Sequence, residues 1–386
     1  MGANAHETVN IGIIGAGLMG REIAAAIRRW PALIDHPAKP QISAVCDINP
    51  AAMEWFEQIE TVTQFTTDYR ELLANPDVDV VYIAVRHDLH EQLYVDAINA
   101  GKDLLAEKPY GIDARAAAAI NAASAANPSV FVRVSSEMPF FPGAQAAVAH
   151  IQSGAIGEIL EVRSAFLHAS DLDTSKPINW KRQKDACGDA GVMNDLGMHA
   201  WHVPLRLGWK PASLSAVLQS VVETRPNPAG GVAACDTWDN ATVYALVDQP
   251  GAHAFPMVVE MKRIAPGHKN SWELEVIGMD GAVRFSTKRP KTVEIFGIET
   301  IPGIGNEQVW KSVDVGSQSV WPSVTGGIFE TGFSDSILQM WAAFLAERAG
   351  ELNDRFGCAT PAEAYTTHEL YEAAITSNAE RSIVSV

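Results

Sequence analysis

The chain has 386 residues, more than a single hydrophobic core usually serves, so we expect two domains. Its formal charge of −17 argues against a nucleic-acid groove or an anionic membrane surface as partner. The four cysteines are widely spaced without a Cys-x-x-Cys pair, and no apolar run is long enough to span a membrane. These features predict a soluble, cytoplasmic protein with reduced thiols.

The first elements are an apolar strand at residues 11–14, a glycine-rich turn, and a helical pattern at residues 21–30. In the spacing G-x-G-x-x-G the first glycine permits a tight turn, and the second lets backbone N–H groups approach a pyrophosphate. The third lets the helix pack closely on the strand. We therefore expect a dinucleotide at this turn. The residues predicted to hold it are Gly15, Gly17, Leu18, Met19 and Gly20.

A second strand at residues 41–46 ends in Asp47, the acid that such a turn requires. A proline-containing insert at residues 31–40 places Asp47 later than the usual spacing of about 20 residues. A carboxylate at this point accepts hydrogen bonds from both ribose hydroxyls and repels a 2′-phosphate, and no arginine follows it directly. Asp47 and Ile48 are thus predicted to bind NAD rather than NADP. The alternative is a glycine turn of some other α/β protein.

Strands and helices continue to alternate up to residue 134, which indicates a doubly wound parallel sheet in a domain spanning residues 1–134. The apolar run at residues 78–85 is typical of a strand that is covered on both faces. Ligands of such sheets bind at the carboxyl ends of the strands. The further elements expected here are helices at 89–100 and 113–126 and strands at 103–106 and 130–134.

The pattern then changes, so we place a second domain at residues 135–386, with its last helix packing back on the first domain. Alternating residues between 214 and 316 predict a large, mainly antiparallel sheet with an open face. That face needs a cover, which a homodimer or homotetramer can supply. The elements expected are helices at 142–153, 195–207, 334–349 and 360–375, strands at 159–168, 241–247 and 256–262, and a hairpin turn at 279–281.

The segment Glu107-Lys108-Pro109 follows the strand at residues 103–106, at the sheet edge where the nicotinamide end of a dinucleotide lies. A lysine there can hold a substrate hydroxyl, relay its proton, or neutralise a developing alkoxide. A surface lysine before a turn is the commoner fate of this residue type. The position of Lys108 favours the catalytic interpretation.

A second constellation is Asp195-Leu196-Gly197-Met198-His199. Asp195 and His199 are four residues apart, so on a helix they share one face, and the carboxylate can orient the imidazole for proton transfer. Gly197 leaves room there for a ligand or a close strand. The alternative is that Asp195 caps the helix and His199 is a packed core histidine.

In this order the glycine turn, Glu107-Lys108-Pro109 and the Asp195–His199 segment resemble the glucose–fructose oxidoreductase/inositol dehydrogenase (Gfo/Idh/MocA) family over essentially the whole chain. Residues 153–158 and the closing helix after Pro361 add smaller similarities. The resemblance implies a Rossmann domain, a second α/β domain with an open-faced sheet, and NAD(P)-dependent oxidation or reduction of a sugar, cyclitol or related polyol. It also implies a cis Lys108–Pro109 bond, and catalysis by Lys108, Asp195 and His199, with His199 as proton acceptor.

Three departures from the family pattern limit what can be carried over. Relatives often have Thr-Pro-Asn before the histidine matching His90, where this chain has Val85-Arg86-His87. Arg86 therefore either contacts the cofactor pyrophosphate or is a solvated loop residue. Residues 138–142 replace an Arg-containing segment, which puts contacts from this loop in doubt. His202 stands where relatives often carry an acid.

Asp195, His199 and His202 fall on one helical stripe, and mixed His/Asp ligands suit zinc. Because hydride chemistry at Asp195 and His199 needs no metal, we expect none and interpret His202 as a structural or substrate-touching residue. Upstream, Trp180 can stack on the apolar face of a sugar. Arg182 is favoured over Lys181 as a substrate contact because a guanidinium presents a fixed fork of donors. The alternative is a loop that covers the cofactor without selecting the substrate.

The sequence thus predicts a cytoplasmic NAD-dependent dehydrogenase that acts on a secondary alcohol of a sugar, sugar derivative or cyclitol, without nucleic-acid or membrane partners. The alternatives are an NAD-dependent glycoside hydrolase and a non-catalytic dinucleotide-binding sugar sensor of the same fold. The residues predicted to bind the cofactor outside the glycine turn are Asp47, Ile48, Arg86, His90, Glu107 and Lys108. Those predicted to bind the substrate are Lys108, Trp180, Arg182, Asp195, His199 and His202.

Overall fold

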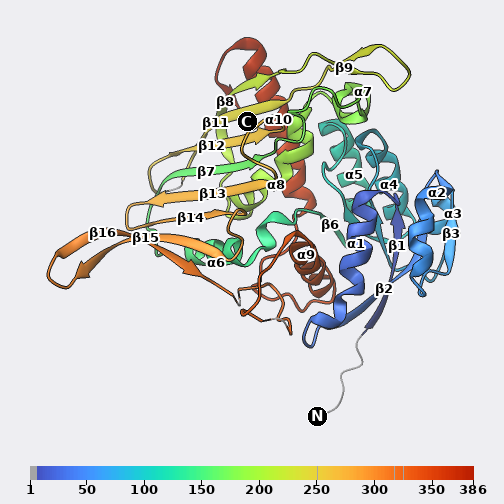
Figure 1. Cartoon of the computed structure of the whole chain (residues 1–386), viewed down its shortest axis with the longest axis horizontal. Coiled ribbons are helices and arrows are strands. Elements are labelled where there is room, and N and C mark those ends of the chain that lie inside the picture. Colours follow the sequence, from blue (N-terminus) through green and yellow to red (C-terminus); the bar gives the residue numbers. More distant parts are fainter. Residues whose placement is uncertain (1–6, 250, 317, 325) are drawn as a thin grey trace. The chain divides into compact units, whose positions relative to one another are not determined.

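The computed structural model describes residues 7–249, 251–316, 318–324 and 326–386, which fall into two compact units (Figure 1). The first unit contains the residues up to Phe140 together with Ser319–Gly326 and Gly332–Tyr365. The second contains Phe141–Gln318, Gly327–Thr331 and Thr366–Val386. No helix in the described part of the chain is long and apolar enough to cross a bilayer.

The first unit is built on a six-stranded parallel sheet in the order β3-β2-β1-β4-β5-β6. This is the strand order of a Rossmann sheet, so the predicted doubly wound architecture is confirmed. All four residues of β4 are buried, as expected for a strand that is covered on both faces. The strands are β1 (Glu7–Ile14), β2 (Ala38–Cys46), β3 (Gln64–Thr66), β4 (Val80–Ile83), β5 (Asp103–Ala106) and β6 (Val132–Val134).

The helices of the first unit follow the predicted order, with shifted ends. Helix α1 begins at Leu18, three residues earlier than predicted, because the glycine turn itself supplies the N-cap, Gly17. Strand β2 takes up the last part of the proline-containing insert, and a 3₁₀ turn, η1 (Trp30–Ala32), takes up the first. Besides η1, the helical elements of this unit are α1 (Leu18–Arg28), α2 (Pro50–Met53), η2 (Glu54–Gln58), α3 (Tyr69–Leu73), η3 (His87–Leu89), α4 (His90–Asn99), α5 (Ala114–Ala126), η4 (Met138–Phe140) and α9 (Phe333–Arg348).

The second unit is built on a nine-stranded sheet in the order β16-β15-β14-β13-β7-β12-β11-β8-β17. Only β7 and β12 pair in parallel, so the prediction of a mainly antiparallel sheet is confirmed. The strands are β7 (Ile159–Leu167), β8 (Pro211–Gln219), β11 (Asn240–Val247), β12 (Phe255–Lys262), β13 (Ser271–Gly278), β14 (Ala282–Ser286), β15 (Thr292–Ile301), β16 (Gly305–Asp314) and β17 (Val384–Ser385), with a separate hairpin of β9 (Thr224–Pro226) and β10 (Val232–Ala234).

Helices cover one face of this sheet. Helix α8 (Val192–Arg206) packs against β7 and β12, and α6 (Pro142–Gln152) packs against β14 and β15. The other face is open, since Tyr244 and Leu246 of β11 are exposed while their neighbours along the strand are buried. The remaining helical elements are η5 (Trp180–Arg182), α7 (Lys184–Cys187) and α10 (Pro361–Glu380), the last of which extends five residues beyond the predicted end.

Candidate active site

The glycine turn of the first unit lies at the carboxyl end of β1. Gly15 has a φ of +102°, and a Cβ on it would lie 2.2 Å from the carbonyl oxygen of Ala84. A Cβ on Gly20 would lie 2.2 Å from the carbonyl oxygen of Gly15, whereas a Cβ on Gly17 would have nothing within 4 Å. Gly15 and Gly20 are therefore required by the fold, while Gly17 borders open space. The backbone there leaves room for a pyrophosphate.

The charges around this turn suit an anion with a ribose next to it. No acidic residue lies in the first turn of α1 and no side chain caps it, so its backbone N–H groups are available to a phosphate. Asp47 follows β2, and its Oδ2 accepts the N–H of Ala16 at 2.8 Å while its Oδ1 accepts the N–H of Asn49 at 2.9 Å. The carboxylate is thus fixed beside the turn with acceptor capacity to spare. These residues fit a dinucleotide.

Two apolar side chains flank the turn and are exposed. Leu18, the first residue of α1, is 75% exposed, and Ile48, directly after Asp47, is 89% exposed. Isolated apolar side chains are common on surfaces, and these two directly follow Gly17 and Asp47 in the chain. Both were predicted to bind the cofactor, and this stays a prediction.

The loops after β4 and β5 are joined by His90. This histidine is fully buried, with Nδ1 2.8 Å from the carbonyl oxygen of Pro109 and Nε2 3.2 Å from that of Val85. Burial lowers the pKa of His90, while the two carbonyl oxygens oppose the shift. Arg86 is exposed, and its guanidinium is paired with Asp88 at 2.5 Å. His90 thus positions the loop that carries Lys108, and the Arg86 side chain remains accessible.

Lys108 is half-buried directly after β5, and its bond to Pro109 is cis, as the resemblance implies. The neighbouring Glu107 is buried and accepts hydrogen bonds from Tyr82 Oη at 2.5 Å and Ser135 Oγ at 2.8 Å. A second buried carboxyl group, Glu137, follows β6. Burial and the charge of Glu107 raise the pKa of Glu137 to about 7, while Lys108 opposes the shift. Glu137 belongs to none of the sequence motifs that pointed to the site.

In the second unit, Asp195 and His199 lie on α8, as predicted, and both are buried. The helix begins after Gly191, so Asp195 lies in its first turn rather than at its cap. Lys181 Nζ donates to Asp195 Oδ1 at 2.8 Å. The ring of His199 packs edge-to-face on Phe166 of β7 at 4.9 Å. The carboxylate and the imidazole are therefore held on one stripe of a rigid helix.

Gly197 serves a different purpose from the one predicted. A Cβ on Gly197 would lie 2.2 Å from Tyr371 Oη, so the space next to it is filled by α10 rather than by a ligand or a strand. His202, one turn after His199, is fully buried. Among the described residues, no three His, Cys, Asp or Glu side chains are grouped in a way that could hold a metal ion.

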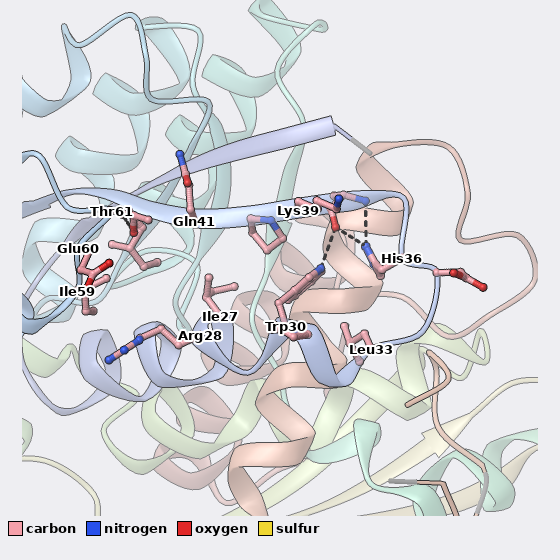
Figure 2. Close-up of a pocket in the computed structure, with 15 residues that line it drawn as sticks. Ile27, Arg28, Trp30, Leu33, His36, Lys39, Gln41, Ile59, Glu60 and Thr61 are labelled. Atoms are coloured by element: carbon pink, nitrogen blue, oxygen red, sulfur yellow. Dashed lines mark hydrogen bonds between the residues drawn. The ribbon is translucent and has the colours of Figure 1, made fainter. Parts of the chain in front are cut away.

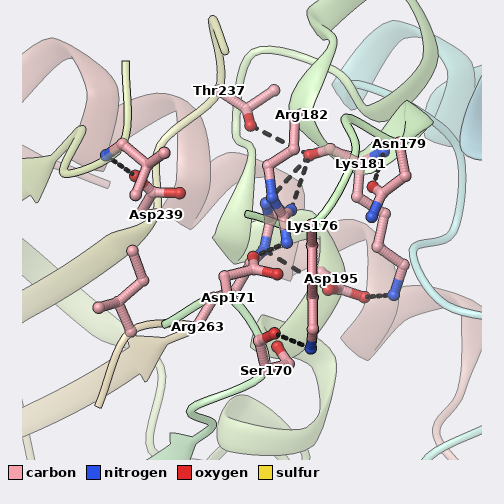
Figure 3. Close-up of polar contacts among 12 residues, drawn as sticks. Ser170, Asp171, Lys176, Asn179, Lys181, Arg182, Asp195, Thr237, Asp239 and Arg263 are labelled. Atoms are coloured by element: carbon pink, nitrogen blue, oxygen red, sulfur yellow. Dashed lines mark hydrogen bonds and ion pairs between the residues drawn. The ribbon is translucent and has the colours of Figure 1, made fainter. Parts of the chain in front are cut away.

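The two basic residues before α8, Lys181 and Arg182, contact different carboxylates. Lys181 is half-buried and its Nζ also lies 5.6 Å from the centre of the Trp180 ring. Arg182 is only 2% exposed and is ion-paired with Asp171. The structure thus places Lys181, not Arg182, against the predicted catalytic carboxylate, and the role of Arg182 in substrate binding remains a prediction. We call the group in Figure 3 made of Asp171, Lys181, Arg182, Asp195, Asp239 and Arg263 the Asp195 cluster.

A cavity of about 660 Å³ lies elsewhere in the first unit (Figure 2). It is lined by the end of α1, the beginning of β2 and residues 59–61, with Trp30 and Leu33 among its apolar side chains. Trp30 Nε1 donates to the carbonyl oxygen of Ala38 at 2.8 Å, which closes one wall. Because this cavity adjoins the amino-terminal half of β2, it lies away from the strand ends where ligands of Rossmann sheets bind.

Comparison with known proteins agrees with this geometry. Residues 9–135 match the model described as "Oxidoreductase family, NAD-binding Rossmann fold", and residues 144–284 match the "GFO/IDH/MocA C-terminal domain". The chain belongs to the Gfo/Idh/MocA oxidoreductase family. The resemblance seen in the motifs is confirmed, and the glycine turn and Asp47 lie in an NAD-binding Rossmann domain.

Two relatives of this family each match three quarters of the chain. Levoglucosan dehydrogenase from Pseudarthrobacter phenanthrenivorans is 26% identical over 306 residues, which cover 75% of this chain and 76% of that protein. Inositol 2-dehydrogenase from Rhizobium meliloti is 27% identical over 290 residues, covering 75% and 78%. The solved complex of levoglucosan dehydrogenase with NADH and levoglucosan has a TM-score of 0.86 at 24% identity, covering 98% and 100%, and so has the same fold.

Sequence reasoning missed the other half of the Asp195 cluster. Arg263 directly follows β12 and is 1% exposed, with its Nε 3.5 Å from Asp195 Oδ2. Asp239 directly precedes β11 and is fully buried. The only signal in the sequence is a charged residue next to an apolar strand, which occurs at many strand ends. It does not indicate which charges meet.

Proposed function

We propose that this protein is an NAD-dependent dehydrogenase that oxidises a secondary alcohol of a sugar, sugar derivative or cyclitol. The observation that carries the proposal is Asp195 held as a carboxylate on α8, one helical turn before the buried His199. A pure dinucleotide-binding sensor has no use for such a pair. The levoglucosan and inositol dehydrogenases among the relatives support the substrate class.

In the proposed reaction His199 takes the proton of the substrate hydroxyl, and Asp195 orients the imidazole and stabilises its charged form. Lys108 holds the same oxygen and neutralises negative charge that develops on it. NAD bound at the glycine turn supplies the hydride acceptor at nicotinamide C4. Lys181, whose Nζ lies between Asp195 and the face of Trp180, is placed to donate a hydrogen bond to a further hydroxyl.

We further propose a cytoplasmic homodimer or homotetramer. The open face of the nine-stranded sheet carries Val217, Tyr244 and Leu246, which are 54%, 54% and 43% exposed, and such a group is favourably covered by a second copy. The four cysteines are all buried, which suits a reducing compartment. Light scattering coupled to gel filtration tests the assembly. A monomer at micromolar concentration contradicts it.

The first test of the activity is NADH formation, followed by absorbance, across a panel of sugars, anhydrosugars, inositols and sugar acids with NAD and NADP in parallel. Turnover with NAD on one substrate group supports the proposal. Sugar release from a glycoside without net NADH indicates the redox-assisted hydrolase instead. Tight NADH binding with no turnover on any substrate indicates the sensor.

A further inference from the structure

Two cations from different segments lie beside the Asp195 carboxylate, one near each oxygen (Figure 3). Lys181 Nζ lies 2.8 Å from Oδ1, and Arg263 Nε lies 3.5 Å from Oδ2. Asp195 is 5% exposed and Arg263 only 1%, so little water screens the second pair. Two neighbouring cations favour the charged form of a carboxyl group and restrict its rotamer.

Arg263 is itself locked in place by other contacts. Its Nη1 donates to the carbonyl oxygen of Lys181 at 3.0 Å, and its Nη2 lies 3.7 Å from Cys187 Sγ. Its backbone N–H donates to the carbonyl oxygen of Asp239 at 3.0 Å. A single guanidinium therefore holds the backbone of the residue that supplies the other cation and places its own charge 3.5 Å from Asp195 Oδ2.

The carbonyl oxygen of Lys181 accepts hydrogen bonds from three side chains. Arg182 Nη1 donates to it at 3.2 Å and Thr237 Oγ1 at 3.0 Å, in addition to Arg263. Three donors on one carbonyl oxygen exceed the needs of a surface turn such as η5. They hold the base of the Lys181 side chain, so its Nζ reaches Asp195 from a fixed point.

The other buried arginines nearby have acceptors of their own. Arg182 is paired with Asp171, and Arg225 donates to the carbonyl oxygens of Asp171 at 2.6 Å and Asp173 at 2.8 Å. Arg225 is 2% exposed, which matches Arg263 in burial. Within the contacts that the structure describes, Arg263 is the arginine that pairs with Asp195. Arg263 and Arg225 are therefore buried to a similar extent but contact different acceptors.

We propose that Arg263 is a positioning residue for the reaction: together with Lys181 it keeps Asp195 ionised and in a single rotamer, aligned with His199 one turn along α8. This inference rests on the proposed function, because it assigns Arg263 a purpose in proton transfer. Arg263 does not touch the substrate in this scheme. It acts through Asp195, and replacing it misaligns the proton acceptor and removes a positive charge near it.

The charged and titratable groups near Asp195 come from several elements, and a pH measurement must take all of them into account. They are Asp171 after β7, Lys181 and Arg182 of η5, Cys187 of α7, His199 of α8, Asp239 before β11 and Arg263 after β12. Of these, Arg263 and Lys181 are the cations in contact with the carboxylate. Removing either cation makes the surroundings of His199 more negative, so the imidazole holds its proton to higher pH.

The test uses Arg263→Met, Arg263→Lys and, as a control of equal burial, Arg225→Met in the full chain. The first readout is the titration of His199 by NMR on histidine-labelled protein, assigned with His199→Asn. Arg263→Met is expected to move the His199 midpoint to higher pH, Arg263→Lys to leave it in place, and Arg225→Met to lower Tm without moving it. This readout requires no substrate, so it decides the inference even if the substrate panel shows no turnover.

The second readout is kinetic, on the substrate that the panel identifies. Arg263→Met is expected to lower kcat about 10- to 100-fold, with the NADH dissociation constant unchanged and partial recovery in Arg263→Lys. If Arg263→Met does not fold, Lys181→Met removes the more exposed cation and must move the same midpoint in the same direction. An unmoved His199 titration in the folded variant overturns the proposal, as does a loss of kcat that Arg225→Met reproduces.

Discussion

The glycine turn of the first unit and the Asp195 cluster of the second are both polar sites, but they are built in different ways. The turn consists of backbone atoms that crowd together because Gly15 and Gly20 lack side chains, next to open space at Gly17. The cluster consists of charged side chains that are buried against one another. The turn is therefore sensitive to added atoms, and the cluster is sensitive to removed charge.

The largest expected effect comes from removing the proposed proton acceptor. His199→Ala is expected to lower kcat about 100- to 10,000-fold, the usual contribution of a general base, and Lys108→Ala to lower it comparably. In His199→Ala the NADH affinity should stay within about twofold, because His199 is not among the residues predicted to bind the cofactor. Steady-state rates and NADH fluorescence titration measure both quantities.

The matched control is His253→Ala, a histidine of the second unit whose side chain is 93% exposed. It should leave both kcat and NADH affinity unchanged. Equal losses of kcat and cofactor affinity in His199→Ala would mean that the two sites are not functionally separate. In that case the glycine turn and the Asp195 cluster would not differ in the way described.

The next effect concerns the buried carboxyl group of Glu137 in the first unit. It is measured as the change in the free energy of unfolding with pH. Burial raises the pKa of Glu137 to about 7 from 4.5, so between these values the folded state holds a proton that the unfolded state has released. Wild-type stability should fall as pH rises from about 4.5 to 7, by an amount on the order of 3 kcal/mol, and then level off. Glu137→Gln should remove this slope. Urea unfolding at pH 5 and pH 8 measures it, and parallel slopes in the two proteins contradict the assignment.

A pair of alanine substitutions separates the structural glycines from the one that borders open space. Gly20→Ala brings a Cβ to 2.2 Å from a backbone carbonyl oxygen and should cost about 1 to 3 kcal/mol of folding free energy. Gly17→Ala meets nothing within 4 Å, so the fold should keep its stability while NADH affinity falls at least about tenfold, or about 1.4 kcal/mol. Urea unfolding and NADH titration separate the two outcomes. Unchanged NADH affinity in Gly17→Ala would show that the open space is not a ligand site.

How much of each site could be predicted from the sequence follows from the same difference. The turn is local: Gly15, Gly17 and Gly20 stand close together, and Asp47 ends the next strand, so spacing alone identified them. The doubly wound parallel sheet followed from the alternation of strands and helices along the chain. The start of α1 was missed because apolar periodicity begins only after the turn, although Gly17 already caps the helix.

The Asp195 cluster was predicted only where it is local. Asp195 and His199 lie one helical turn apart, and helix geometry identified them as neighbours. Arg263 approaches from the end of β12, a contact that no local pattern encodes. Donor geometry favoured Arg182 over Lys181 as a substrate contact, and this stays a prediction. The tertiary fold decides that Lys181 contacts Asp195 while Arg182 contacts Asp171.

The smallest expected effect tests whether Asp47 acts on the cofactor or only on the turn. Asp47 Oδ2 accepts the N–H of Ala16 in the turn after β1 at 2.8 Å, and Asp79 Oδ2 accepts the N–H of Asn10 within β1 at the same distance. Asp47→Ala and Asp79→Ala each remove one such bond to β1 or its turn, so both should lower stability by about 1 kcal/mol. Only Asp47→Ala should also weaken NAD binding, by about tenfold, and narrow the preference for NAD over NADP, because only this carboxylate is predicted to bind the ribose hydroxyls. Equal cofactor affinity in the two variants would mean that Asp47 only stabilises the backbone of the turn. The preference for NAD over NADP would then depend on the exposed residues beside the turn, Leu18 and Ile48.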